Sequence, residues 1–390
     1  SNKNPKMPTG DIEIDVDRLT VLNKSKIPPF TIEDDTDGGE ELRMQYRYLD
    51  LRRNVMKETM IFRHELNLSI RNFLSEKSFL EIETPFLIKS TPEGARDFIV
   101  PSRLNPGNFY ALPQSPQLLK QLLMFAGMDR YFQIVRCFRD EDFRADRQPE
   151  FTQLDCEMSF VEREDILDLF EDMMRYLFNK LLNIDLPTFP RLTYQKAMET
   201  YGSDKPDLRF DMPIIDITDK LKGHGFKFFD DSEYIGGLLL INKPSVSRKY
   251  IDKLTEWVKS PQIGSTGMAY IRYLDGELKA SISRFFSNED LQKIMNSLKA
   301  GNNDILFIIS GNKEKSLNIL GNLRLKLAND YQLIQKNTFK PLWVIEFPMF
   351  EWDDENQRYT ASHHPFTSPL NEDIELLDTN PAIARSNAYD

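Results

Sequence analysis

The charged segment at residues 138–151 gathers the side chains best suited to binding a charged substrate. On a β-strand, Arg139 and Glu141 would point to the same face, because they stand two residues apart. A guanidinium there can clamp an anion, while the carboxylate beside it accepts a hydrogen bond from an amine or a hydroxyl. Arg144 and Arg147 add enough positive charge to meet a triphosphate or the end of an RNA. The alternative is a hairpin tip with ordinary surface ion pairs.

The strand expected at Phe151–Phe160 alternates between apolar and polar side chains. Its apolar face carries Leu154, Cys156, Met158 and Phe160, and its polar face carries Gln153, Asp155, Glu157 and Ser159. Such alternation is common in a strand with one wet face. Here, however, the polar face adjoins Arg139 and Glu141 across the hairpin, and this predicts the floor of an active site.

Three helices and two more strands are expected around this hairpin. A helix of roughly 25 residues carries one apolar stripe made of Phe62, Leu66, Ile70, Phe73 and Leu74. A strand with Leu80 and Ile82 on one face follows it, and Pro85 places that strand at a sheet edge or a break, because proline donates no hydrogen bond. The partner strand of the hairpin is expected at Tyr131–Phe138.

The second helix is expected to start with Ser115 as N-cap and Pro116 at its first position, and the third to span Arg163–Leu182. Later, residues 209–333 alternate short strand-like pieces with amphipathic helices, which indicates an inserted α+β unit. Pro341–Pro348 then returns to the buried-strand pattern of the earlier sheet. Near the start, Asp11–Asp17 alternates like a strand and leads into a connector rich in proline and acidic residues. The pattern favours an antiparallel sheet with flanking helices, and no glycine-rich nucleotide motif is present, so any ATP must be held in another way.

Composition narrows the class of protein. The net charge of −11 argues against non-specific coating of nucleic acid, although a local basic patch can still contact RNA. No run approaches the ~18–20 apolar residues that span a bilayer, and residues 1–10 lack a signal pattern, so no membrane partner is expected. Cys137 and Cys156 lack metal-site spacing, and we expect buried thiols in a reducing cytoplasm.

Three longer strings make a family resemblance specific. They are Thr91–Asp97 (TPEGARD), Ala111–Leu118 (ALPQSPQL) with Lys120, and His363–Pro369 (HHPFTSP). With the Arg139–Glu141 hairpin, which resembles the second motif of class II aminoacyl-tRNA synthetases, they resemble bacterial-type aspartyl-tRNA synthetases. The resemblance covers residues 44–390 and implies a class II antiparallel sheet flanked by helices, with an inserted α+β domain. The expected domains are a connector at 1–43, a catalytic domain at 44–208 and 336–390, and the insertion at 209–335.

The resemblance implies a role for each candidate site residue. Arg139 would contact the α-phosphate of ATP and the substrate carboxylate, with Glu141 on the adenine side. Gln148 and Phe151 would hold the adenine, which would stack on the phenyl ring. The pocket for L-aspartate would be formed by Glu93, Ser115, Gln117, Lys120, Arg139, Asp155 and His363.

Two of these residues would read the charges of the amino acid. Asp155 would receive the ammonium group of aspartate, and Lys120 would bind the side-chain carboxylate and so distinguish aspartate from asparagine. Gln117 and Lys120 lie three residues apart on the first turns of a helix, hence on one face, near a helix N-terminus that favours an anion. His363 would lie on a mobile loop, nearer the substrate than His364. With four histidines in the chain, a catalytic zinc site is not expected.

The resemblance also implies segments that the sequence does not contain. Asp390 would be the first of two acids that hold Mg²⁺ between the ATP phosphates, and the second acid and the third class II motif would follow it. An N-terminal five-stranded barrel that reads the anticodon would precede residue 1. We therefore expect the sequence to be part of a longer protein, cut at both ends.

The expected activity is that of an aspartate–tRNA ligase with ATP and Mg²⁺ as cofactors and tRNA as acceptor. The acceptor would be the aspartate tRNA, with the asparagine tRNA left open. A homodimer is expected through residues 54–87, whose helix carries more apolar residues than one core-facing stripe needs. Two alternatives stay open: a paralogous class II synthetase for asparagine, and a catalytically inactive dimerising or tRNA-binding fragment.

Overall fold

The computed structural model describes residues 3–7, 9–91, 93–142, 147–243, 246–274, 276–364 and 366–390. The chain divides into two compact units, Ser1–Lys77 and Ser78–Asp390. The expected domain boundaries at residues 43/44, 208/209 and 335/336 stay predictions. No helix within the described ranges is long and apolar enough to cross a membrane.

The first unit contains α1 (Glu40–Gln45), α2 (Arg47–Asp50) and α3 (Asn54–Glu76). The strand predicted at Asp11–Asp17 is wrong: this segment forms no strand, and its apolar side chains Ile12, Ile14 and Val16 are exposed. Apolar alternation alone does not make a strand, because the backbone groups need a partner. On α3 the predicted stripe is buried only at Ile70, Phe73 and Leu74. The exposed apolar side chains of the helix are Val55, Met60, Ile61, Phe62 and Leu68.

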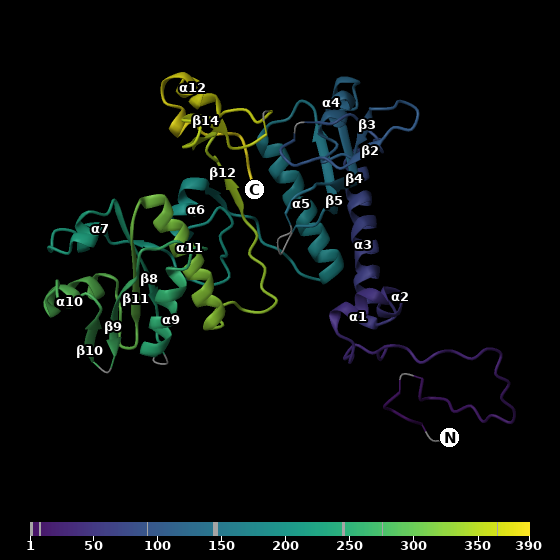
Figure 1. Cartoon of the computed structure of the whole chain (residues 1–390), viewed down its shortest axis with the longest axis horizontal. Helices are drawn as coiled ribbons and strands as arrows, with labels where there is room; N and C mark the ends of the chain where they lie inside the picture. The colour runs from purple at the N-terminus through teal and green to yellow at the C-terminus, as the bar shows by residue number, and fades with distance from the viewer. Residues whose placement is uncertain are drawn as a thin grey trace. The chain divides into compact units, whose positions relative to one another are not determined.

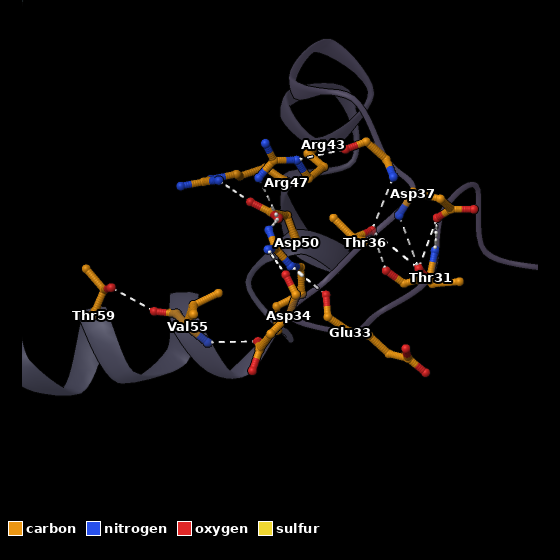
Figure 2. Close-up of polar contacts among 12 residues, drawn as sticks. Thr31, Glu33, Asp34, Thr36, Asp37, Arg43, Arg47, Asp50, Val55 and Thr59 are labelled. Carbon is orange, nitrogen blue, oxygen red and sulfur yellow. Dashed lines mark hydrogen bonds and ion pairs between the residues drawn. The ribbon is translucent and has the colours of Figure 1, made fainter. Parts of the chain in front are cut away.

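A buried carboxylate ties the helices of this unit together. Asp50 is fully buried and pairs with Arg53 at 2.8 Å, with Arg43 at 3.7 Å and with Arg47 (Figure 2). The hydrogen bond from Arg53, helped by the charges of the other two arginines, lowers the pKa of Asp50 although burial acts in the opposite direction. The carboxylate therefore stays ionised at neutral pH.

The same cluster holds the connector against the start of α3. Arg53 donates to the carbonyl of Glu33 at 2.9 Å and to that of Asp34 at 2.8 Å. The Asp34 carboxylate in turn accepts from the backbone N–H of Val55 at 3.1 Å (Figure 2). It thereby satisfies one of the N–H groups that a helix leaves free at its first turn.

The second unit begins with a three-stranded sheet in the order β1-β4-β5. Its strands are β1 (Leu80–Glu81), β4 (Arg130–Phe138) and β5 (Glu150–Met158). The expected antiparallel hairpin is confirmed, whereas β1 pairs with β4 in parallel. β1 lies at the edge of the sheet, in agreement with the interpretation of Pro85. Phe160 was expected on the apolar face, but β5 ends at Met158, and Phe160 has a φ of 58° and is 98% exposed.

A second hairpin and helix α4 lie between β1 and β4 in the chain, and helix α5 follows β5. The prediction of α5 (Arg163–Leu182) is confirmed, with a capping box between Glu162 and Asp165. α4 spans Gln117–Phe125, so Pro116 is the N-cap, and the expected cap at Ser115 is wrong by one residue. The hairpin consists of β2 (Ile99–Pro101) and β3 (Phe109–Ala111).

The segment predicted as an insertion forms its own five-stranded antiparallel sheet, ordered β10-β9-β11-β8-β7. The strands are β7 (Ile215–Asp216), β8 (Tyr234–Leu240), β9 (Ala269–Leu274), β10 (Glu277–Ala280) and β11 (Ile305–Gly311). One face is covered by α9 (Arg248–Val258) and α11 (Lys313–Asp330), and the other by α7 (Thr218–Leu221), α8 (Lys227–Asp230) and α10 (Asn288–Ser297) (Figure 1). Along β11, Ile305, Phe307 and Ile309 enter one core, and Leu306 and Ile308 enter the other, as the period of two requires.

The remaining elements precede and follow the five-stranded sheet along the chain. β6 (Arg191–Thr193) leads into α6 (Tyr194–Tyr201) and pairs in parallel with β12 (Trp343–Ile345). The buried strand expected within Pro341–Pro348 is confirmed as β12, and it pairs with β6. β13 (Phe350–Asp353) and β14 (Arg358–Ala361) form a hairpin. The short helices η1 (Asn371–Asp373), α12 (Leu376–Thr379) and η2 (Pro381–Ile383) follow it.

Candidate active site

Arg139 and Glu141 lie just beyond the end of β4. β4 ends at Phe138, as predicted, so both residues belong to the loop, and the argument that they share one face of a strand does not apply to them. Backbone hydrogen bonds from Arg139 to Pro149 at 2.9 Å and from Asp140 to Arg96 at 3.1 Å fix the chain there instead. The two predicted residues still line one pocket of about 600 Å³.

The lining of this pocket is strongly charged. It consists of Arg96, Arg139, Asp140, Glu141, Asp142 and Arg147. The guanidiniums can meet phosphate oxygens in a bidentate fashion, and the carboxylates can accept from amines or hydroxyls. Arg144 was expected to contribute as well, and it lies outside the described residues. Sequence reasoning missed Arg96, whose only signal was its place in the Thr91–Asp97 string.

The guanidinium of Arg139 lies over the ring of Phe151, 5.0 Å from its centroid. Phe151 is half-buried on β5, and Gln148, in the loop before it, is exposed. A flat aromatic face with a cation above it suits a planar ligand carrying negative charge. Phe151, which is expected to hold adenine, therefore lies next to Arg139, which is expected to contact phosphate.

A second cluster lies on α4 and β5. Lys120 is a buried residue of α4, and its ammonium group is 2.7 Å from Asp155 Oδ1 and 3.3 Å from Glu157 Oε2. Burial by itself would lower the pKa of Lys120, but the two carboxylates outweigh it, so the pKa is raised and the ammonium is charged at neutral pH. Burial raises the pKa of Asp155, with Lys120 acting in the opposite direction. The sequence places Glu157 on the polar face of its strand, but the sequence analysis assigns it no role.

Lys120, Asp155 and Glu157 line a pocket of about 530 Å³, and Asp390 lines it too. The remaining lining is mainly apolar: Leu154, Cys156, Met158, Val161, Ile166, Phe170, Trp343 and Tyr389. Cys156 is half-buried, and burial raises the pKa of its thiol to about 12. Cys137 is buried, as expected, with a pKa of about 11. Both thiols therefore stay protonated.

A small network at the start of α4 includes three predicted residues. The hydroxyl of Ser115 donates to Glu93 Oε2 at 2.7 Å and accepts from the N–H of Gln117 at 3.2 Å. The neighbouring Gln114 is buried, and its amide pairs with both backbone groups of Ala95 at 2.9 and 3.1 Å. Sequence reasoning gave Gln114 no role, although it lies inside the Ala111–Leu118 string. Gln114 holds the chain that follows Glu93.

The two adjacent histidines differ in exposure. His363 is half-buried with its ring edge-on to Phe347 at 5.5 Å, whereas His364 is exposed. Nε2 of His363 is buried and has no hydrogen-bond partner within the described part of the chain. His363 is not among the described residues that line either pocket, so the structure does not bring it to the Lys120 cluster.

Asp390 does not sit in a metal site as the structure stands. Its backbone pairs with Val344 at 2.8 and 3.0 Å, and its carboxylate is 3.5 Å from Lys205. Among the residues that the structure describes, no three His, Cys, Asp or Glu side chains gather to hold a metal ion. A single carboxylate paired with a lysine does not fit Mg²⁺, which is held with near-octahedral geometry.

Comparison with known proteins agrees with this arrangement. Residues 39–390 match the family model described as tRNA synthetases class II (D, K and N). The chain belongs to this family of aminoacyl-tRNA synthetases, which use ATP and a divalent metal in general. Proteins named aspartate–tRNA ligase from Porphyromonas gingivalis and Bacteroides fragilis are each 56% identical to it, and one from Flavobacterium psychrophilum is 53% identical. Each match covers 100% of this chain and 67% of the relative.

Proposed function

We propose that this chain activates L-aspartate with ATP and transfers it to the 3′-terminal adenosine of the aspartate tRNA. The α-carboxylate of aspartate attacks the α-phosphate in line and pyrophosphate leaves. A hydroxyl of the terminal adenosine then attacks the mixed anhydride and AMP leaves. No covalent enzyme intermediate is needed, so the residues act by positioning and by neutralising charge.

One observation carries the choice of amino acid: a buried, charged lysine lies between two carboxylates in a pocket. Aspartate has a carboxylate for Lys120 and an ammonium group for Asp155. When aspartate binds, the Lys120–Asp155 ion pair can therefore be replaced by two new ion pairs, one for each of these residues. Asp155 Oδ2 supports this role, because it is buried without a hydrogen-bond partner among the described residues. Asparagine would leave the lysine facing a neutral amide.

The charged pocket is proposed to take the nucleotide. Arg139 would meet the α-phosphate and the reacting carboxylate, with Phe151 under the adenine and Glu141 and Gln148 at its edge. The short distance from Arg139 to the Phe151 ring supports this assignment. Ser115, Glu93 and Gln117 would shape the amino-acid pocket, and His363 would approach only if its loop moved.

We propose that Asp390 would contribute one ligand to the divalent metal, after its carboxylate is released from Lys205. The names of the relatives support aspartate as the substrate and do not extend the acceptor to an asparagine tRNA. The two free, protonated thiols support a cytoplasmic location.

A homodimer through residues 54–87 is also proposed. Its support is the exposed apolar surface of α3, where Val55, Met60, Ile61 and Leu68 are each 45% exposed or more. Apolar side chains gathered on one element are typical of a surface that another chain covers.

Exchange of radioactive pyrophosphate into ATP tests the function. The chain is incubated with aspartate, asparagine or lysine in turn, and charging of aspartate tRNA is measured in parallel. Exchange that depends on aspartate alone supports the proposal. Exchange with asparagine alone would favour the paralogue, and binding of tRNA without any exchange would favour an inactive tRNA-binding fragment.

A further inference from the structure

Tyr131 is a fully buried phenol beside the amino-acid pocket, and it is not among the residues assigned above. In the β4–β5 register, Gln133 lies directly opposite Asp155, and Tyr131 lies directly opposite Glu157. Since side chains two residues apart share a face of a strand, Tyr131, Gln133 and Asp155 all lie on the same face of the sheet.

The amide of Gln133 fixes the direction of the hydrogen bonds on this face. In one orientation of the amide, its nitrogen donates to the carbonyl of Ile82 at 3.3 Å and to the Tyr131 hydroxyl at 2.9 Å. Its oxygen then accepts from the backbone N–H of Thr84 at 3.3 Å. The opposite orientation would set the amide oxygen against the Ile82 carbonyl, and buried acceptors do not face each other without cost. The Tyr131 oxygen is thus an acceptor for Gln133.

This direction leaves the phenol proton of Tyr131 free to point elsewhere. Asp155 lies on the same face, and its Oδ2 is buried without a hydrogen-bond partner among the described residues, so a free proton and a free acceptor lie on one face of the sheet. Burial, together with the charge of Asp155, raises the pKa of the phenol. Tyr131 therefore remains a donor at neutral pH. Asp155 already uses Oδ1 for Lys120, so its other oxygen can take both a donor from the protein and a donor from a ligand.

We propose that Tyr131 is a positioning residue for amino-acid recognition: when the substrate separates Asp155 from Lys120, the hydroxyl proton of Tyr131 turns to the unpartnered Oδ2 of Asp155 and holds the carboxylate in the orientation that receives the ammonium group. Thr84 fixes the orientation of the Gln133 amide, and the hydrogen bond from Gln133 to the Tyr131 oxygen then sets the direction of that proton. The inference rests on the proposed function and adds to it a residue that touches no substrate. In this proposal, part of the affinity for the ammonium group comes from the buried hydrogen bonds that connect Thr84, Gln133 and Tyr131 to Asp155.

Two ligands separate this role from a general effect on folding. L-aspartate has two carboxylates and an ammonium group, whereas succinate has the two carboxylates alone. Tyr131→Phe should weaken binding of L-aspartate to the full chain by about 10-fold or more, as expected for a hydrogen bond to a charged group. It should change succinate binding by less than about twofold. Calorimetry, and the ligand-dependent rise in melting temperature at millimolar concentrations, measure both ligands.

Tyr110→Phe is the matched control, because Tyr110 is an exposed tyrosine on β3, and it should leave both ligands unchanged. If Tyr131→Phe does not fold, Gln133→Leu releases the Tyr131 proton from its fixed direction and should weaken L-aspartate selectively in the same way. Equal binding by Tyr131→Phe and the unchanged chain, or equal weakening of both ligands, would overturn the inference alone. Failure of the unchanged chain to bind L-aspartate would overturn the proposed function and this inference with it.

Discussion

The ammonium group of Lys120 lies 2.7 Å from Asp155 Oδ1, so the two residues proposed to hold opposite charges of aspartate neutralise each other. Both side chains are about nine-tenths buried. Removal of one partner would leave the other as an unpaired buried charge, which typically costs about 3–5 kcal/mol. An incoming aspartate can separate them without leaving either charge unpaired.

Lys120→Met should therefore remove the preference for aspartate over asparagine. We expect aspartate-dependent pyrophosphate exchange to fall by on the order of 10²-fold, and asparagine to lose less, because a neutral amide does not need the cation. Exchange with both amino acids is measured on protein whose melting temperature has been determined. Lys293→Met, at an exposed lysine of α10 paired with Glu289, is the control. An undiminished preference for aspartate would mean that another cation reads the side chain.

Arg139→Ala should lower aspartate activation by on the order of 10²-fold or more, as for a guanidinium that contacts the reacting phosphate. Steady-state pyrophosphate exchange at varied ATP gives the effect on kcat and KM separately. The matched control is Arg136→Ala, which removes an exposed arginine three residues earlier whose partner is Glu150. Rates within a few-fold of the unchanged chain would contradict the role of Arg139.

Gly321→Ala should destabilise the packing of α11 against the end of α6. A Cβ at Gly321 would lie 2.2 Å from the carbonyl oxygen of Gly202, whose own φ of +66° favours glycine. Such overlap with backbone forces the two elements apart, typically at about 1–3 kcal/mol. Urea unfolding should show a lower midpoint. Gly301→Ala, where the nearest atom is 3.8 Å away, should behave like the unchanged chain. A common midpoint for both variants would count against the close contact.

The Asp50 cluster should make the first unit sensitive to acid. The pKa of Asp50 in the folded chain lies below the unfolded value of 3.8, so the folded state favours the ionised form. Its contribution to stability is complete above about pH 5 and is lost as the pH falls through the folded pKa. The protection of the α1–α3 amides against hydrogen exchange, corrected for the intrinsic exchange rate at each pH, should fall steeply below pH 4, and Asp50→Asn should flatten that dependence. A dependence unchanged by Asp50→Asn would assign the effect to another carboxylate.

Ile61→Asp should convert a dimer to monomers if α3 lies in the proposed interface. Ile61 is 46% exposed, so a carboxylate is tolerated in the monomer but not in an apolar contact between two chains. Sedimentation velocity at micromolar concentration measures the change, and exchange activity should fall with it. Lys57→Asp, on the same helix, provides a control for the charge alone. If the parent chain and the variant both sediment as monomers, the proposed interface is refuted.

The sequence alone determined the local elements with the strongest patterns. The period of 3.6 and the polar termini located α5 to the residue, and the alternation of residues 151–158 identified β5. Three short strings, Thr91–Asp97, Ala111–Leu118 with Lys120, and His363–Pro369, were enough to indicate the family together with the Arg139–Glu141 hairpin.

Only the tertiary structure decided how these pieces meet. That β1 pairs with β4 in parallel, that β12 pairs with β6, and that Asp11–Asp17 remains without a strand partner all depend on residues far away in the chain. The same holds for the pairing of Lys120 with Asp155, which lie 35 residues apart, and for the burial of Tyr131 beside them. A pattern along the chain records which face of an element is apolar, whereas pairing, burial and pKa depend on which groups are brought together in space.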